Sequence, residues 1–461
     1  MADFDSTRIL IYAFSYAERI LEEVPYLRYS AERSLCFLWD LRDPAVRAVV
    51  ITSEPVDPVT LEYHFRDVFR FDDRMMHSAR ERLTLLTPES GQKRPLDELC
   101  LADERIMDVL QKATEQSSRA TVVHFMASDA LGQLAQRIGA DLEEGPQSFV
   151  ARWGSKAGGK QILARAGVAV PDGPAETLHS EQDVVREIER LAAGPRRVRR
   201  VMVKLSASTY TASIGNVLID CDELRRTGDL IAAAEVIRMP AEDFYRELAT
   251  GGAIVEEFLE GIDSSPSGLG HIDADGTVRV AATHDQVLSG GQYWGCRFPA
   301  EERWRPGIAD AVLSTGAVLA ELGHRGTFGI DFVTVGERGP IGVEVNLRKV
   351  GPSHVLRYAE ALVGRDVDAD GLLRRSDGRP MCYVHGRLHK PEELGSLDPG
   401  VAIERLRAHE LLYTHDKGEG VALHVLGALR ACGFVELTAL APTFDAADAY
   451  LKAAEASLLG A

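Results

Sequence analysis

Short apolar runs alternate with amphipathic segments over the first 150 residues of the chain. The apolar runs lie at residues 9–12, 48–51, 83–86 and 121–125. Continuous apolar runs of this length are typical of strands buried on both faces, and the spacing of Leu131, Leu134 and Ile138 is typical of a helix. Strands and helices in alternation predict an α/β domain with a mainly parallel, doubly wound sheet. No G-x-G-x-x-G follows the first run, so a dinucleotide site is not expected there.

Capping and turn signals divide the middle of the chain into further elements. Ser155 is expected to cap a short helix that Gly167 closes, and Ser180 with Asp183 forms a capping box for a second helix. Extended segments are expected at residues 201–205, 217–219 and 278–298, the last around a turn at 289–291. A polar loop at 206–216 separates the first two of them.

Residues 329–346 form two arms of alternating residues joined by a turn, which predicts a β-hairpin. With a loop at 336–339, Asp331 lies opposite Glu344, and Asn346 points the same way as Glu344. Side chains on cross-strand neighbours are roughly 5 Å apart, so two carboxylates there repel each other unless a cation neutralises them. Mg²⁺ binds carboxylate and amide oxygens of this kind. The hairpin therefore predicts a magnesium site of Asp331, Glu344 and Asn346, with a solvated edge hairpin as the alternative.

A second motif imitates a phosphate-binding loop. Residues 154–161 match G-x-x-x-x-G-K with Lys160 as the lysine, but Gln161 stands where Ser or Thr would bind Mg²⁺. The segment before it, residues 150–153, is also a poor buried strand. Because both requirements fail, a P-loop is only the minor interpretation of this motif.

The composition is that of an ordinary globular protein. The 461 residues are 45% apolar and 26% charged, and the length allows about three domains. The net charge of −18 argues against nucleic acid or an anionic membrane as the main partner. The six cysteines contain no C-x-x-C pair, which argues against a structural zinc or a disulfide framework. No stretch approaches the ~20 apolar residues of a membrane span, and we expect a cytoplasmic protein.

These elements, in this order, resemble the ATP-grasp superfamily of carboxylate–amine ligases. The similarity covers residues 150 to 360, and the sequences Glu-Val-Asn-Leu-Arg-Lys from Glu344 and Leu-His-Val-Leu-Gly-Ala from Leu423 resemble the pheganomycin-type peptide ligases. The resemblance implies an α/β protein with an ATP-grasp core at 151–365. It further implies a pre-ATP-grasp domain at 1–150, a small C-terminal α/β domain at 376–461, and a mobile lid at residues 200–255.

The resemblance also assigns the residues that bind ATP and Mg²⁺. The nucleotide-binding set is Lys156 and Lys204 at the phosphates, Glu256, Glu257, Phe258 and Leu259 as the hinge whose backbone meets the adenine, and Asp263 at the ribose hydroxyls. Asp331, Glu344 and Asn346 match the Mg²⁺ ligands, as the hairpin pattern predicts by itself. Asp263 stands where glutamate is commoner. The loop from Ser206 has no glycine before Gly215, so the sequence does not decide whether this loop closes over the phosphates.

An arginine is expected to assist the chemical step. Arg348 matches the arginine often found beyond the metal ligands, where a guanidinium would stabilise the oxyanions of an acyl phosphate and of the tetrahedral intermediate. Strict alternation beyond Asn346 would place its side chain on the face of the metal ligands. Gly329 stands where D-alanine–D-alanine ligases carry a catalytic arginine, so Arg348 is predicted to take over that task, with Arg297 as a second candidate.

The resemblance predicts an ATP-dependent ligase that joins a carboxylate to an amine through an acyl phosphate and releases ADP and phosphate. Small-molecule substrates and a natural-product pathway are expected, and a homodimer is left open. Two alternatives are kept. A phosphotransferase of the same fold would need a phosphohistidine domain, for which His424 is a weak candidate, more simply explained as a packed histidine. A nucleotide-binding regulatory or scaffold protein would bind ATP without turnover.

Overall fold

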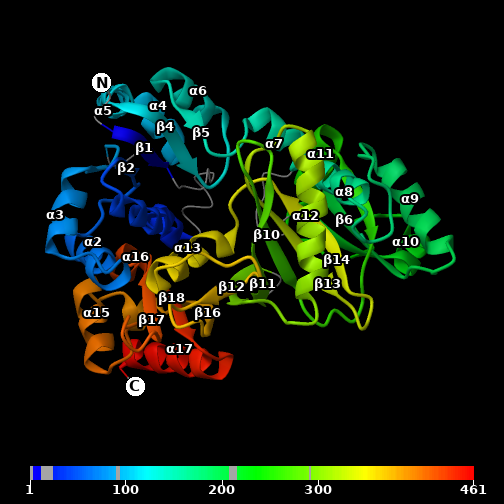
Figure 1. The fold of residues 1–461 in the computed structure, drawn as a ribbon. Helices are drawn as coiled ribbons and strands as arrows, with labels where there is room; N and C mark the ends of the chain where they lie inside the picture. Colours follow the sequence, from blue (N-terminus) through cyan, green and yellow to red (C-terminus); the bar gives the residue numbers. More distant parts are fainter. Residues whose placement is uncertain (1–3, 12–23, 90–93, 207–214, 290–291, 461) are drawn as a thin grey trace. The chain divides into compact units, whose positions relative to one another are not determined.

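The computed structural model describes residues 4–11, 24–89, 94–206, 215–289 and 292–460. These residues form two compact units (Figure 1). The first unit contains residues 1–147, 295–299 and 348–461, and the second contains 148–294 and 300–347. The chain from Arg348 onward thus clusters with the N-terminal part, and the division into three domains stays a prediction. No helix of the described segments is both long and apolar enough to cross a membrane.

The N-terminal part of the first unit is a parallel sheet in the order β3-β2-β1-β4-β5. Its strands are β1 (Phe4–Ile11), β2 (Val46–Ile51), β3 (Leu83–Leu86), β4 (Ser117–His124) and β5 (Asp141–Leu142). The connecting helical segments are η1 (Pro25–Arg42), α2 (Pro58–Tyr63), η2 (His64–Val68), α3 (Asp73–Glu81), α4 (Leu96–Ala102), α5 (Glu104–Glu115) and α6 (Asp129–Ile138). Ile9, Val49 and Val122 are fully buried in its core. The predicted doubly wound α/β sheet is confirmed.

The C-terminal part of the first unit is an antiparallel sheet. Its strands are β15 (Leu373–Arg374), β16 (Pro380–His389), β17 (Gly420–His424) and β18 (Phe434–Ala441), and residues 296–298 of β12 (Gln292–Phe298) pair with β16. The helices are α13 (Gly351–Val363), α14 (Pro391–Leu394), α15 (Pro399–Ala408), α16 (Gly427–Cys432) and α17 (Phe444–Leu459). All residues of β18 are buried, so this strand forms the centre of the local core.

The second unit contains an antiparallel sheet of order β8-β7-β6-β9 at the place of the predicted lid. Its strands are β6 (Arg200–Leu205), β7 (Asn216–Asp220), β8 (Ala234–Val236) and β9 (Ala253–Glu257), and its helices are α9 (Glu181–Ala193), α10 (Cys221–Thr227) and α11 (Ala241–Gly251). Val203, Val255 and Phe244 belong to its core. The predicted N-cap of α9 is confirmed, because Asp183 N donates to Ser180 Oγ, but Asp183 Oδ2 accepts from the Ser180 hydroxyl and not from the Ser180 backbone N–H that a full capping box would use. The predicted loop closure falls on residues 207–214, outside the described segments.

The rest of the second unit is an antiparallel sheet of order β14-β13-β10-β11, built from β10 (Pro266–Ile272), β11 (Val278–Ser289), β13 (Gly326–Thr334) and β14 (Pro340–Asn346). The helices are α7 (Gln147–Trp153), α8 (Lys156–Arg165) and α12 (Arg305–Glu321). Helix α8 packs closely on β14, because a Cβ at Gly159 would lie 3.3 Å from Val345 Cβ. The expected turn at 289–291 includes residues 290 and 291, which are not described.

Candidate functional site

The hairpin β13–β14 has the register that its alternation predicts. Asp331 pairs with Glu344 across the two strands, and Gly329 pairs with Asn346. A bulge follows Asp331, so the register shifts between Asp331 and Phe332. The predicted opposition of the two carboxylates is therefore confirmed.

Each of these carboxylates already has polar partners. Asp331 Oδ1 accepts a hydrogen bond of 2.6 Å from Gln286 Nε2, and Asp331 Oδ2 accepts one of 3.1 Å from Asn346 Nδ2. Glu344 Oε1 lies 2.5 Å from Lys156 Nζ. The lysine thus supplies the positive charge that two opposed carboxylates require. The oxygen set of Asp331, Glu344 and Asn346 fits a hard cation such as Mg²⁺, for which Lys156 is the competing charge.

Lys156 is the first residue of helix α8, and this helix places the lysine beside the hairpin. Ser155 Oγ accepts a hydrogen bond of 3.0 Å from Gly158 N, which confirms the predicted cap. Lys156 N also donates to Ser206 O at 3.2 Å, at the end of β6. The P-loop interpretation is wrong, because helix α7 stands where the strand of a P-loop would be.

Lys204 and Lys160 share one buried carboxylate. Glu256 Oε2 lies 2.6 Å from Lys204 Nζ, and Glu256 Oε1 lies 2.9 Å from Lys160 Nζ. Lys204 Nζ also donates to Val343 O at 3.2 Å, beside Glu344. Burial raises the pKa of Glu256, but the two ammonium groups lower it by a larger amount. The pKa of Glu256 is therefore below its usual value. Glu256 is therefore a buried anion between two cations.

The hinge residues lie at the end of β9, and their backbone is partly bonded. Glu257 N donates to Asp172 O at 2.8 Å and Phe258 N donates to Arg200 O at 3.0 Å. Leu259 is buried. Asp263 is exposed, and its Oδ2 accepts a hydrogen bond of 2.7 Å from Gly336 N in the turn of the hairpin. The adenine and ribose contacts of this segment stay predictions.

The two candidate catalytic arginines belong to the first unit. Strand β14 ends at Asn346, so the alternation that was expected to orient Arg348 does not extend to it. Arg348 Nη1 donates to Lys349 O at 3.0 Å, and its Cζ lies 5.3 Å from the ring centre of Phe125. Arg297 forms a bidentate ion pair with Asp448 at 2.9 and 3.0 Å. Their catalytic roles stay predictions, and Arg297 would have to leave Asp448 to contact a substrate.

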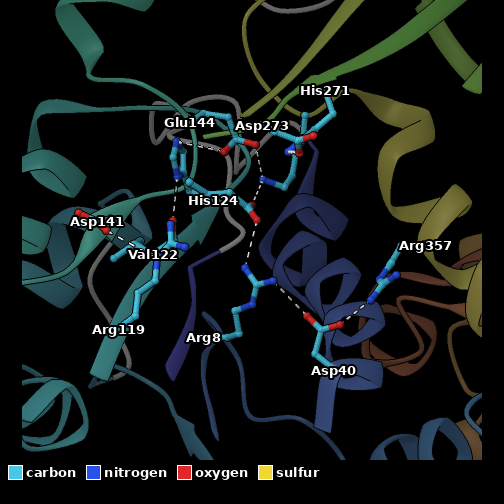
Figure 2. A network of polar contacts seen from close by, with 12 residues as sticks. Arg8, Asp40, Arg119, Val122, His124, Asp141, Glu144, His271, Asp273 and Arg357 are labelled. Atoms are coloured by element: carbon cyan, nitrogen blue, oxygen red, sulfur yellow. Dashed lines mark hydrogen bonds and ion pairs between the residues drawn. The ribbon is translucent and has the colours of Figure 1, made fainter. Parts of the chain in front are cut away.

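A chain of alternating charges holds the segment around Arg348. Lys349 is buried and pairs with both Glu143 and Glu144, the latter at 2.5 Å. Arg8 Nη1 lies 3.3 Å from Glu143 Oε1, and Arg8 Nη2 lies 3.5 Å from Asp40 Oδ2. His124 Nε2 lies 3.7 Å from Glu144 Oε2 (Figure 2). These contacts fix the backbone that carries Arg348 to the ends of β4 and β5.

One further group in the described part of the chain has the composition of a metal site. His354, His385 and Glu436 are buried, and their possible ligand atoms lie within 4.8 Å of one another. However, Glu436 accepts hydrogen bonds of 2.7 and 3.1 Å from Arg33 and one of 3.0 Å from Arg387. Guanidinium groups thus already bind both oxygens of the carboxylate, and a divalent cation would have to displace them. We interpret the group as a closed ionic network.

His424 does not support the phosphohistidine alternative. The side chain is fully buried, and its Nε2 shares a hydrogen bond of 2.7 Å with Thr438 Oγ1. Phosphoryl transfer requires a histidine that a phosphate donor can reach.

Sequence reasoning missed Gln286 and the role of Lys160. Gln286 lies at the exposed end of β11, where a polar residue gives no signal of its own. In the sequence, Lys160 belongs to a false P-loop motif, although its i, i+4 spacing from Lys156 places both lysines on one face of α8. That spacing is the signal that could have identified it.

Comparison with known proteins gives one relative of high identity. The chain is 67% identical over 460 residues to the L-propargylglycine–L-glutamate ligase of Streptantibioticus cattleyicolor, and the match covers 100% of this chain and 95% of that protein. The model of the PGM1 C-terminal domain matches residues 401–453.

Solved structures give the same fold at low identity. The biotin carboxylase–β,γ-ATP complex from Campylobacter jejuni has a TM-score of 0.59 at 14% identity, covering 98% of this chain and 90% of that chain. The biotin carboxylase domain dimer of the Hydrogenobacter thermophilus 2-oxoglutarate carboxylase, with MgADP, has a TM-score of 0.57 at 16% identity and the same coverage. The ADP complex of purK, an N5-carboxyaminoimidazole ribonucleotide synthetase, has a TM-score of 0.54 at 13% identity, covering 98% and 97%.

Proposed function

Since the chain belongs to the ATP-grasp superfamily of carboxylate–amine ligases, and within it to the pheganomycin-type ligases, we propose that it joins L-propargylglycine to L-glutamate. The support for this substrate pair is the 67% identity, over the whole chain, to a ligase named for it. The product is an amide between the two amino acids. A biosynthetic pathway for a small peptide-like natural product is the setting that such a product fits.

The reaction proceeds in two steps with balanced atoms. An oxygen of one substrate carboxylate attacks the γ-phosphorus of ATP, which gives an acyl phosphate and ADP. The amine of the second substrate then attacks the acyl carbon, and the tetrahedral intermediate loses inorganic phosphate and a proton. No side-chain nucleophile is needed, so catalysis depends on placement of the reactants and on neutralisation of charge.

The metal would be held by Asp331, Glu344 and Asn346. When bound, Mg²⁺ supplies charge neutralisation for the phosphate oxygens. Lys156, whose Nζ lies 2.5 Å from Glu344 Oε1, would then be free to turn its ammonium group to the nucleotide phosphates, and Lys204 would bind the phosphates from β6. Arg348 stabilises the oxyanions of the acyl phosphate and of the tetrahedral intermediate, since a guanidinium offers fixed donors to such groups.

The observation that carries the proposal is the cross-strand pair of Asp331 and Glu344 with Asn346 and Lys156 in contact. A protein that binds nucleotide without turnover would not need every one of these charges in reach of one another.

The test is a coupling reaction followed by mass spectrometry. The protein is incubated with ATP, Mg²⁺, L-propargylglycine and L-glutamate, and each substrate is left out in turn. We expect one dipeptide that requires all four components. Replacement of L-propargylglycine by other small amino acids then measures how narrow the specificity is. Nucleotide binding without any amide from this pair or from a mixture of amino acids would contradict the proposal.

A further inference from the structure

Three lysines and two carboxylates form a connected group in the second unit. Lys156 and Lys160 lie one turn apart on α8, and Lys204 comes from β6. Lys156 pairs with Glu344, while Lys160 and Lys204 both pair with Glu256. The proposed function uses Lys156 and Lys204 and leaves Lys160 without a task.

The three members of the Glu256 group differ in how far they are enclosed. The exposed fraction of the side chain is 5% for Lys160, 3% for Glu256 and 12% for Lys204. The Lys160 ammonium also donates to Pro171 O at 2.9 Å. Lys160 is thus held on two sides inside the unit. Lys204 instead has its second contact at Val343 O, one residue before the predicted metal ligand Glu344.

We propose that Lys160 is a positioning residue that keeps Glu256 neutralised when Lys204 leaves it for the phosphates of ATP. A buried carboxylate that loses one of two cations still has the other, whereas a carboxylate that loses its only cation is strongly destabilised. With Lys160 in place, Lys204 can exchange Glu256 for a phosphate oxygen. Without Lys160, Glu256 retains Lys204, and the nucleotide loses a charge-assisted contact. This inference rests on the proposed function, because it requires ATP to bind at Lys204.

The alternative is that Lys160 only stabilises the fold. It then connects α8 to β9 and to Pro171, and its loss lowers stability without a specific effect on nucleotide binding. The two interpretations differ in the role of Glu256. If Lys160 acts by neutralising Glu256, removal of the carboxylate charge makes Lys160 dispensable for ATP binding.

The experiment measures the dissociation constant of MgATP by isothermal titration calorimetry for the full chain and four variants. These are Lys160→Met, Glu256→Gln, the double variant Lys160→Met/Glu256→Gln, and Lys204→Met. We expect Lys160→Met to weaken MgATP binding by about 10- to 100-fold, the range of one hydrogen bond to a charged group. The double variant should bind MgATP within about threefold of the single variant Glu256→Gln, because without the Glu256 carboxylate Lys204 has no competing anion whether or not Lys160 is present.

Thermal unfolding of the same variants separates binding from stability. The inference would be overturned if Lys160→Met lowers the melting temperature but leaves the MgATP dissociation constant unchanged. An equal loss of affinity from Lys160→Met in the parent and in Glu256→Gln would overturn it too, because the effect would not act through Glu256. If Lys160→Met does not fold, Lys160→Gln keeps a hydrogen-bond donor at this place and removes the charge, and the same outcomes apply.

Failure of the proposed function gives a different result. In that case the parent protein binds no MgATP, or Lys204→Met binds it as well as the parent does. If the parent binds MgATP and Lys204→Met weakens it, while Lys160→Met does not, only the inference about Lys160 is wrong.

Discussion

Both units contain a buried carboxylate that lies between two cations, but the cations differ. In the first unit Glu436 lies between Arg33 and Arg387, and its side chain is fully buried. In the second unit Glu256 lies between Lys160 and Lys204. The charge pattern is the same in both places. Arg33 binds Glu436 with two parallel hydrogen bonds from a rigid planar group, whereas each lysine reaches Glu256 with a compact ammonium on a flexible stem.

The difference separates a structural network from an exchangeable one. The Arg33–Glu436 pair is closed, with side-chain exposures of 4% and 0%. In the second unit, the Lys156–Glu344 pair is more exposed to solvent, with side-chain exposures of 18% and 35%. We therefore expect a ligand to reach the Lys156–Glu344 pair in the second unit more readily than the Arg33–Glu436 pair in the first. Buried charge alone does not identify a functional site, because the ability of the partners to exchange must be considered as well.

The largest expected effect is a loss of turnover when a predicted metal ligand of the second unit is replaced. Glu344→Gln or Asp331→Asn should reduce turnover by at least about 10³-fold, because the metal contributes several kcal/mol of charge stabilisation to the reaction. The melting temperature should stay close to that of the parent. Phosphate release under saturating substrates and Mg²⁺ is the measurement, and Glu337→Gln, an exposed change in the turn of the same hairpin, is the control. Normal rates in both site variants would exclude this metal site.

In the network around Glu436, a substitution should lower stability and leave MgATP binding unchanged. Arg33→Met leaves Glu436 with one guanidinium, and we expect the free energy of unfolding to fall by about 3–5 kcal/mol, the usual effect of breaking a buried ion pair. MgATP affinity of the folded protein should not change. Urea unfolding and calorimetry give the two values.

Two variants control this second prediction. Arg28→Met removes an exposed arginine of the same helical segment and should have little effect on stability. Arg33→Met/Glu436→Gln removes both charges of the pair and should recover part of the lost stability. A changed ATP affinity at unchanged stability would abolish the distinction between the two networks.

Arg348 tests whether the first unit also contributes to chemistry. Arg348→Ala should lower kcat by about 10²–10³, the effect of losing an oxyanion donor, and Arg348→Lys should also be impaired because it lacks the planar fork. Arg297→Ala should have the smaller effect, since Arg297 is engaged with Asp448. Steady-state kinetics with saturating ATP and both amino acids measure this. A kcat of Arg348→Ala close to that of the parent, or a larger loss in Arg297→Ala, would reassign the task.

The smallest expected effect is a pH dependence of stability from a buried histidine of the first unit. Burial lowers the pKa of His64 to about 4 from 6.5. Between these values the unfolded chain binds a proton that the folded chain does not, so stability is full above the upper value and decreases as the pH falls. His64→Gln should reduce the slope by up to about 1.4 kcal/mol per pH unit. Urea unfolding at pH 7, 6 and 5 measures it, and an unchanged slope would contradict the assignment.

The parts of the fold that depend on local periodicity could be predicted from the sequence. The register of Asp331 with Glu344 followed from alternation alone, because a strand has a strict period of two. The Ser155 cap and the parallel strands of the first sheet were predictable for similar reasons. The strand order β3-β2-β1-β4-β5 was not, because periodicity marks the strands but not their neighbours.

The contacts that decide the electrostatics were beyond prediction. Glu256 meets Lys160 only because α8 and β9, distant in the sequence, pack together. The orientation expected for Arg348 had no basis once β14 ended at Asn346. In the same way, the bond from Gln286 to Asp331 depends on how three strands lie beside one another, which no local pattern encodes.

In the proposed reaction the γ-phosphoryl group of ATP is transferred to a substrate carboxylate, and an ¹⁸O label in that carboxylate follows the transfer. L-propargylglycine and L-glutamate are labelled in turn with ¹⁸O in their carboxylates, and the products are analysed by ³¹P NMR, in which ¹⁸O shifts the phosphorus signal. We expect ADP and inorganic phosphate that carries one ¹⁸O from a carboxylate of one of the two amino acids for each amide formed. Label in AMP with release of pyrophosphate, or amide formation without any label in phosphate, would contradict it.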